Sequence, residues 1–365
     1  MNFPKKIVFV SHDPGGFNLL IPVIQLFSED VAFEVHLLLA GAALKKYSAL
    51  TPVENFLHLI ESFPCEHFPN EYDVNKSDVE NVLQKISPNI IFTGTSINSN
   101  IERYCIQYGN EIGITTLSYI DSWIGEDVRF TSNILEAYPS VILVCDKAME
   151  GLYQKFITDN CSVAVVGNAH LEILYLQSKL LTDVESVVDS KRVLFFSENL
   201  FHYYPDGKLN EMQIIQQILQ AYSGIFKITI SIRPHPLESN EHWLLFLDKN
   251  KSINPFISLE LDYTNDVKAS IRRSSMTFGI SSMALIESSL MGVYTFSYQV
   301  GIAEDKDMLY IPFEEYGIEQ ITEITEACSV IEYAGKKSRL IAGGPLPFKD
   351  SLQKIKNIIC AGISE

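Results

Sequence analysis

Short apolar runs alternate with longer amphipathic segments along almost the whole chain. A short apolar run bounded by turn residues predicts a buried strand, and apolar positions three or four residues apart predict a helix. In the first half, the expected strands are Ile7–Val10, Phe33–Leu39, Asn89–Phe92, Gly113–Ser118, Val141–Cys145 and Ser162–Val166. The expected helices between them are Phe17–Phe27, Asp78–Lys85, Asn100–Tyr108 and Lys147–Phe156. This alternation indicates a parallel sheet covered by helices on both faces, and right-handed crossovers make it Rossmann-like.

A second alternation of the same kind begins near residue 191. Its expected strands are Arg192–Phe196, Ile225–Ile232, Ser258–Leu261, Met276–Gly279 and Tyr294–Ser297. Its expected helices are Met212–Tyr222, Glu241–Lys249 and Ser282–Met291. We therefore expect an α/β chain of two tandem Rossmann-like domains, residues 1–170 and 191–347, joined by a linker at 171–190. Residues 348–365 hold a last helical pattern, Phe348–Cys360.

Composition narrows the class of protein. With 365 residues, of which 47% are hydrophobic and 20% charged, the chain can fold into two domains of ordinary size. A net charge of -17 opposes general binding to nucleic acid or to an anionic membrane, but leaves room for a local basic pocket that takes one small anion. The six cysteines form no C-x-x-C pair, so we expect buried free thiols and no metal framework. The first apolar run is too short for a signal peptide and no run reaches membrane-spanning length, so we expect a cytoplasmic protein.

One motif follows the expected strand Ile225–Ile232 directly: Arg233-Pro234-His235-Pro236. The two prolines restrict the backbone on both sides of His235. Arg233 offers a planar fork for phosphate, and His235 offers a donor that can carry charge near neutral pH. Ligands bind at the carboxyl ends of strands in open α/β sheets, so a phosphate site is one interpretation and a solvated rigid loop is the other.

A second polar segment, Ser11–Asn18, follows the first strand and contains His12, Asp13, Gly15, Gly16 and Asn18. The glycines permit a tight turn and close approach of a ligand, and the next helix offers free N–H groups to an anion or a sugar hydroxyl. The segment lacks both the G-x-G-x-x-G and the Walker patterns. A helix entry capped by Asp13 is the alternative.

A third candidate follows the strand Gly113–Ser118. Asp121 would accept protons from sugar hydroxyls, and the indole of Trp123 would pack on a sugar face. A capping aspartate beside a half-buried tryptophan explains the same residues.

A fourth candidate lies where the strand Met276–Gly279 meets a helix. Ser281 and Ser282, with the first free amides of that helix, would form a neutral cradle for an anion, and Glu287 could reach a ribose. Ser281 or Ser282 could equally serve as a simple N-cap.

The order of these motifs resembles that of glycosyltransferases with the GT-B architecture, two Rossmann-like domains that face a cleft. The second half is the more similar, through Arg192–Phe196, then Arg233-Pro234-His235-Pro236, then Ser281-Ser282 with Glu287 and Gly292. This order is similar to bacterial sialyltransferases, polysialyltransferases and capsule Kdo transferases, and to CDP-glycerol glycerophosphotransferases.

The resemblance implies roles for the matching positions. His235 would contact the donor phosphate and assist departure of the nucleotide, while Ser281 and Ser282 would bind the phosphate. Glu287 would hold the ribose or base. Those transferases also carry a general base in an Asp/Glu-Asp-Gly tripeptide of the first domain, which this chain lacks. The dipeptide Asp206-Gly207 lies in the second half of the chain, and Gly125-Glu126-Asp127 has the wrong order. Asp13 and Asp121 are therefore chosen as candidates for the general base because of their positions.

The activity implied by the resemblance is an inverting, metal-independent transfer of a sugar from a nucleotide donor to a surface glycan, as in capsule or lipopolysaccharide synthesis. A CMP-activated acidic sugar is the first expectation for the donor, with UDP- or CDP-linked donors open, and no cofactor is expected. The partners would be the nucleotide sugar and the glycan, and peripheral membrane association stays open.

Two other functions remain open. UDP-N-acetylglucosamine epimerases and related hydrolases use the same two-domain scaffold, and His12, Asp13 and Gly15-Gly16 would then carry the chemistry. A noncatalytic module that binds a sugar or nucleotide would fit the missing tripeptide.

Overall fold

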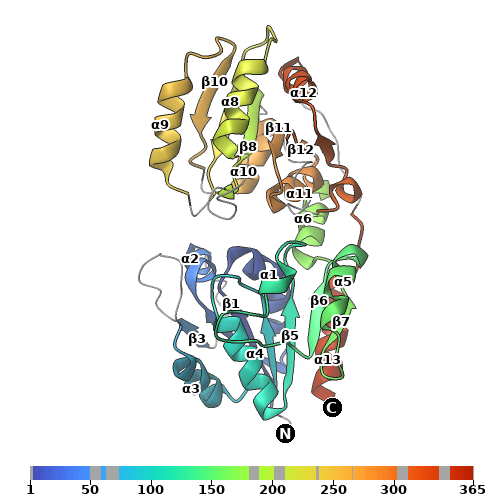
Figure 1. Cartoon of the computed structure of the whole chain (residues 1–365). Helices are drawn as coiled ribbons and strands as arrows, with labels where there is room; N and C mark the ends of the chain where they lie inside the picture. Colours follow the sequence, from blue (N-terminus) through green and yellow to red (C-terminus); the bar gives the residue numbers. More distant parts are fainter. Residues whose placement is uncertain are drawn as a thin grey trace. The chain divides into compact units, whose positions relative to one another are not determined.

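The computed structural model describes residues 3–49, 59–62, 74–180, 189–200, 210–235, 238–264, 266–301, 311–336 and 346–364. The chain divides into two units: unit 1 comprises residues 1–172 and 348–365, and unit 2 comprises residues 173–347. Each unit has its own parallel sheet with helices on both faces (Figure 1). The predicted α/β class with two Rossmann-like domains is therefore confirmed. Pro236, Cys65 and the dipeptide Asp206-Gly207 lie outside the described residues.

The sheet of unit 1 has seven parallel strands in the order β3-β2-β1-β4-β5-β6-β7. Alternate residues of β1 point to opposite faces, so Ile7 and Phe9 belong to one core cluster and Val8 and Val10 to the other. A strand that is buried on both faces must be apolar throughout, which explains its continuous apolar run. The strands are β1 (Lys5–Ser11), β2 (Phe33–Leu39), β3 (Leu59–Ser62), β4 (Ile90–Thr93), β5 (Thr115–Tyr119), β6 (Val141–Val144) and β7 (Ser162–Val165).

Helices α1 and α13 pack on one face of this sheet, and α3 and α4 pack on the other (Figure 1). The last helix is part of unit 1 because Ile355 and Ile359 lie in its core. The Glu172 carboxylate accepts the backbone N–H groups of Asp350 (2.8 Å) and Ser351 (2.9 Å) at the start of that helix. The helices are α1 (Pro14–Ser28), α2 (Gly41–Ala49), α3 (Lys76–Ile86), α4 (Ile101–Ile112), α5 (Lys147–Tyr153), α6 (Ala169–Leu180) and α13 (Ser351–Ser364).

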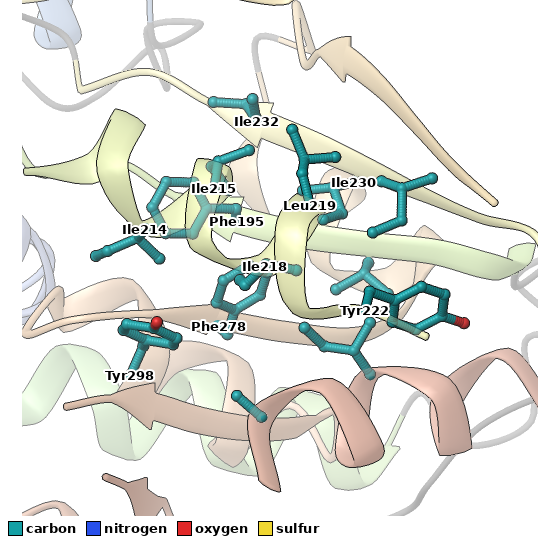
Figure 2. Packing of buried hydrophobic residues seen from close by; sticks show 14 of the residues in the cluster. Phe195, Ile214, Ile215, Ile218, Leu219, Tyr222, Ile230, Ile232, Phe278 and Tyr298 are labelled. Carbon is teal, nitrogen blue, oxygen red and sulfur yellow. The ribbon is translucent and has the colours of Figure 1, made fainter. Parts of the chain in front are cut away.

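The sheet of unit 2 has six parallel strands in the order β10-β9-β8-β11-β12-β13. One apolar stripe of α8, which includes Ile214 and Ile218 at helical spacing, packs with the C-cap Tyr222 against Phe195 and Ile230 of the sheet (Figure 2). The strands are β8 (Asp189–Phe196), β9 (Ile228–Arg233), β10 (Ile257–Leu261), β11 (Ser274–Gly279), β12 (Tyr294–Tyr298) and β13 (Glu319–Ile321). The helices are α8 (Glu211–Ala221), α9 (Asn240–Asn250), α10 (Val267–Arg273), α11 (Met283–Leu290) and α12 (Ile324–Lys336).

Both sheets reverse their strand order at one point. In unit 1 the chain runs outward from β1 through β2 to β3, then continues on the other side of β1 with β4. In unit 2 the same reversal falls between β8 and β11. The loops after these strands leave in opposite directions, so each reversal opens the carboxyl edge of its sheet to a ligand.

The expected strands are present in both units, but some boundaries and elements differ. Strand β9 begins at Ile228 instead of Ile225, whose side chain is 74% exposed. Helix α1 begins earlier than predicted, at Pro14, where a proline suits the first helical turn. The sequence interpretation missed β3, β13, α2, α10 and α12. The described cysteines are free thiols, and four of the five are buried.

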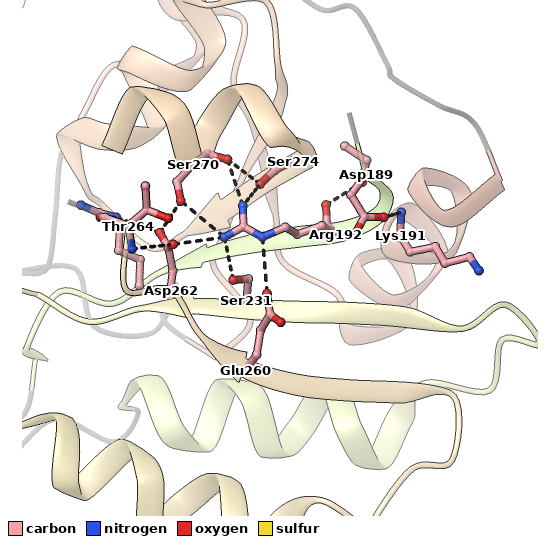
Figure 3. Close-up of polar contacts among 11 residues, drawn as sticks. Asp189, Lys191, Arg192, Ser231, Glu260, Asp262, Thr264, Ser270 and Ser274 are labelled. Atoms are coloured by element: carbon pink, nitrogen blue, oxygen red, sulfur yellow. Dashed lines mark hydrogen bonds and ion pairs between the residues drawn. The ribbon is translucent and has the colours of Figure 1, made fainter. Parts of the chain in front are cut away.

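A buried ionic network joins β8, β9, β10 and α10 in unit 2 (Figure 3). Asp262 lies 3.3 Å from Arg192 Nη2 and 2.7 Å from Arg233 Nη1, and its side chain is only 2% exposed. Burial raises the pKa of Asp262, but hydrogen bonds from Ser270, Thr264 and Arg233 outweigh it and hold the pKa below its ordinary value. The stability that Asp262 contributes is therefore present above that ordinary value and is lost as the pH falls through the lowered pKa.

We expect Asp262→Asn to destabilise unit 2 by about 3 kcal/mol, because it removes the buried carboxylate that pairs with both Arg192 and Arg233 and leaves Arg192 with the half-exposed Glu260 at 3.5 Å. Unit 2 contains one of the two tryptophans, Trp243, so a Trp123→Phe background makes denaturant unfolding of this unit visible by fluorescence. The matched control is Asp248→Asn, whose exposed carboxylate pairs with Lys251 and should matter little. Equal unfolding midpoints for the two variants would contradict the prediction.

Candidate functional site

The loop after β1 carries a dyad of His12 and Asp13. Asp13 has the extended backbone of an N-cap, but its side chain makes no capping hydrogen bond to α1. Its Oδ1 lies 2.6 Å from His12 Nδ1 instead. The His12 side chain is 4% exposed and that of Asp13 is 30% exposed. Asp13 is therefore the N-cap of α1 through its backbone alone, while its side chain pairs with His12 and is the member of the dyad that meets solvent.

Gly15 and Gly16 let the loops after β4 and β5 approach the start of α1. A Cβ on Gly15 would overlap Asp121 Oδ2, and one on Gly16 would lie 3.3 Å from the Cα of Gly94. These glycines thus make room for Asp121 and for the β4 loop within the protein itself. Asp13 and Asp121, which the sequence interpretation chose by position alone, are brought to the same end of α1.

The Asp121 carboxylate is held by a buried cation. Arg129 Nη1 donates to Asp121 Oδ1 at 2.7 Å and to Thr95 Oγ1 at 2.6 Å. The same guanidinium donates to the carbonyl of Ile124 through Nε and Nη2. Burial lowers the pKa of Arg129, but the charges of Asp121 and Asp13 more than compensate, so its pKa is raised. The carboxylates of Asp13 and Asp121 therefore both interact with the charge of the buried Arg129 guanidinium.

Three candidates of unit 1 are placed differently from the expectation. Trp123 is 2% exposed, and its Nε1 donates to the Asp146 carboxylate, so the indole belongs to the core and offers no platform for a sugar. The Asn18 side chain accepts a hydrogen bond from Lys46 of α2. His12 is buried as well, so we assign it to the support of Asp13 and not to direct sugar binding.

In unit 2 the expected anion cradle already holds a carboxylate. Glu198, which follows β8, accepts the N–H groups of Ile280 (2.8 Å) and Ser281 (2.7 Å) and the Ser281 hydroxyl. Burial raises the pKa of Glu198 although these donors lower it. Ser281 and two backbone N–H groups just before α11 therefore bind a carboxylate, that of Glu198, and the binding of a phosphate there stays a prediction. The Ser282 hydroxyl accepts the N–H of Ala284 and caps α11, and Glu287 lies partly buried one turn further along the helix.

Arg233 is the last residue of β9 and His235 follows that strand, but the Arg233 side chain is part of the ionic network around Asp262. Its Nη1 donates to Asp262 and, at 2.7 Å, to the carbonyl of Thr264. The His235 backbone N–H donates to Glu238 at 2.5 Å. Arg233 is therefore fixed by unit 2 itself, and His235 is fixed through its main chain.

The sequence interpretation missed residues whose partners are distant in the chain. Glu198 follows strand β8 directly, so a strand-end position was a usable signal. Glu102 offered none: it lies within the helical pattern of α4, where it accepts the His12 N–H from 90 positions away at 2.7 Å. Thr95, which follows β4, was also passed over.

Within the described ranges, no three His, Cys, Asp or Glu side chains are arranged to hold a metal ion. A search of the same residues for a helix long and apolar enough to cross a membrane finds none.

Two Rossmann-like units in one chain, each with the order reversal described above, define a fold of the GT-B type. No protein-family model matches the sequence, and no curated protein matches it. Solved structures with this fold do match. The UDP-GlcNAc 2-epimerase of Methanocaldococcus jannaschii is 14% identical, with 98% of this chain and 99% of that chain covered and a TM-score of 0.65.

Two further structures are similar over the same length. The UDP-GlcNAc 2-epimerase of Neisseria meningitidis bound to UDP-GlcNAc is 12% identical, with coverage of 98% and 100% and a TM-score of 0.65. Anabaena HepE in complex with UDP and glucose is 14% identical, with coverage of 98% and 100% and a TM-score of 0.58. At these identities the likeness establishes the fold.

We expect Gly15→Ala to destabilise unit 1 by about 1–3 kcal/mol, because the added methyl group displaces Asp121 from Arg129. Trp123 reports unfolding of unit 1 in a Trp243→Phe background. The control is Gly151→Ala in α5, where a Cβ would meet nothing within 4 Å. That variant should be unchanged or up to about 1 kcal/mol more stable. If both variants unfold at the same denaturant concentration, the close approach of Asp121 to Gly15 is wrong.

Proposed function

We propose that this chain is a nucleotide-sugar enzyme, with glycosyl transfer to an acceptor hydroxyl as its reaction. The observation that carries the proposal is the Asp13 carboxylate, which is partly exposed at the reversal of the unit 1 sheet and backed by the buried His12 imidazole. A positioned carboxylate within reach of a hydroxyl can act as a general base. The GT-B fold, shared with proteins whose structures hold UDP or UDP-GlcNAc, supports the class of substrate.

In this mechanism Asp13 removes the proton from the acceptor hydroxyl as the sugar is transferred. Asp121, which Arg129 holds in place, orients the acceptor or sugar by accepting hydrogen bonds from hydroxyl groups. Unit 2 binds the nucleotide: His235 and the cradle of Ser281 and Ser282 receive its phosphate, and Glu287 its ribose or base. Because Glu198 occupies that cradle, a phosphate that binds there has to displace its carboxylate.

The donor is proposed to be UDP-linked. Two of the fold-related structures named above hold UDP-GlcNAc or UDP, and this favours uridine over the CMP-activated acidic sugar that the motifs first suggested. CMP- and CDP-linked donors remain in the test because the serine cradle recognises phosphate and not the base.

Epimerisation or hydrolysis of a nucleotide sugar is the second candidate. It is favoured by the presence of two carboxylates, Asp13 and Asp121, at one helix start, since acid and base groups on a sugar ring need more than one side chain. The two fold-related UDP-GlcNAc 2-epimerases also support it. It differs from transfer in consuming the nucleotide sugar without an acceptor.

A ligand panel tests the proposal. We expect UDP or a UDP-sugar to raise the melting temperature of the protein and His235→Ala to reduce that shift, with CMP and CDP compounds measured alongside. Product analysis by NMR, with and without glycan acceptors, separates transfer from epimerisation or hydrolysis. Binding without any product would select a noncatalytic module. The absence of a shift with every UDP, CDP and CMP compound would sink the proposal.

We expect Asp13→Asn to lower kcat by about 10²- to 10⁴-fold, because the amide keeps the shape of the carboxylate but cannot take a proton. Nucleotide affinity should stay unchanged, since Asp13 belongs to unit 1. Asp127→Asn is the control: its 73% exposed carboxylate in the same unit contacts Lys155. Full activity of Asp13→Asn would assign the base elsewhere.

A further inference from the structure

Glu102 is a buried carboxyl group directly behind the His12–Asp13 dyad. It lies in the first turn of α4 and is 2% exposed. Its Oε1 accepts the backbone N–H of His12, whereas its Oε2 makes no hydrogen bond to any part of the chain that the structure describes. Burial raises the pKa of Glu102 to about 7. Burying a carboxyl group destabilises the folded state unless hydrogen bonds or charged partners compensate for the lost hydration.

The adjacent Arg103 does not neutralise Glu102 through a hydrogen bond. Its guanidinium donates to the carbonyl oxygens of Ser99 (2.6 Å), Ser96 (3.0 Å) and Val128 (2.6 Å). Arg103 therefore ties together the loops after β4 and β5. Among the described residues, the hydrogen bond that the Glu102 carboxylate accepts comes from His12.

The His12 side chain is enclosed on several sides. Asp13 Oδ1 lies 2.6 Å and Ser96 Oγ 3.4 Å from its Nδ1. At the opposite edge, a Cβ on Gly41 would overlap Nε2, so the start of α2 closes against the ring and admits glycine there. The enclosure leaves the ring one orientation, in which it faces Asp13.

Among the described residues, two carboxyl groups act on the pKa of His12: Asp13, which follows β1, and Glu102 of α4. Arg103, the next residue of α4, is coupled to Glu102 and Asp13, while the β4 loop and α2 bring the neutral Ser96 and Gly41 against the ring. Burial lowers the pKa of His12, but the hydrogen bond to Asp13 and the charge of Glu102 outweigh burial, so the pKa is raised. The charge on His12 thus depends on Glu102.

We propose that Glu102 is a positioning residue for Asp13 and acts through His12. Its carboxylate fixes the His12 peptide and favours the charged imidazole, and the imidazole in turn holds Asp13 in one orientation toward the substrate. This inference rests on the proposed function only in taking Asp13 as the group that meets the substrate. The effect of Glu102 on His12 is a property of the protein alone.

The first test follows the ring nitrogens of His12 by ¹⁵N NMR, with the signal assigned by its loss in His12→Asn. In the wild type we expect His12 to stay charged above the ordinary midpoint of about pH 6.5. Glu102→Gln keeps an acceptor for the His12 N–H but removes the charge, so the midpoint should fall by about one pH unit. Glu111→Gln, an exposed change on the same helix, should leave it unchanged.

The second test measures turnover and stability. Glu102→Gln should lower kcat about tenfold with KM unchanged and shift the pH profile of kcat/KM. A carboxyl group with a raised pKa stabilises the folded state fully below its ordinary value, and this contribution is lost as the pH rises through about 7. The melting temperature of the wild type should therefore decline over that range more steeply than that of Glu102→Gln.

A His12 midpoint that is equal in the wild type and Glu102→Gln would overturn the inference whether or not the protein turns over a nucleotide sugar. If Glu102→Gln fails to fold, the wild-type titration decides alone, since a His12 midpoint at or below about pH 6.5 contradicts the proposed coupling. A wild type without turnover, in which the midpoint still depends on Glu102, would instead reject the proposed function and keep the coupling.

Discussion

The reversal of strand order in each parallel sheet is the constraint on which the rest of this structure depends. Because β1 and β4, and likewise β8 and β11, send their helices in opposite directions, the carboxyl edge between them is open. The loops at these two edges bring polar side chains and backbone N–H groups together. Asp13 follows β1, Thr95 follows β4, Glu198 follows β8 and Ser281 follows β11.

Carboxylates at the carboxyl edges of the two sheets are held by different kinds of partner. At the edge of unit 1, Asp13 and Asp121 pair with side chains that can carry positive charge, the His12 imidazole and the Arg129 guanidinium. At the edge of unit 2, Glu198 is held by backbone N–H groups and a hydroxyl. This difference is in keeping with the proposal of acid–base work in unit 1 and nucleotide binding in unit 2.

The sequence was sufficient where local patterns decide the structure. Continuous apolar runs located the strands because burial on both faces demands them, and strand ends located Asp13, Asp121 and Ser281. Contacts between distant positions could not be read in this way. The hydrogen bonds of Glu102 and Glu198 span 90 and 83 positions. Trp123 was misplaced because a strand-end indole can turn inward as readily as outward, and the carboxylate of Asp146 decided its direction.

The structure also distinguishes Asp13 from Asp121, which the sequence left as equal candidates for the general base. The partner of Asp121 is a guanidinium, which keeps its charge at any pH a protein tolerates, so that ion pair is permanent. The partner of Asp13 is an imidazole, which gains and loses a proton near neutrality. A general base must change its own protonation in each turnover, and a partner that can change with it opposes that cycle less than a fixed charge does. Asp13 is also the more exposed of the two carboxylates, at 30% against 21%, so within the proposed function we assign the base to Asp13 and the anchor to Asp121.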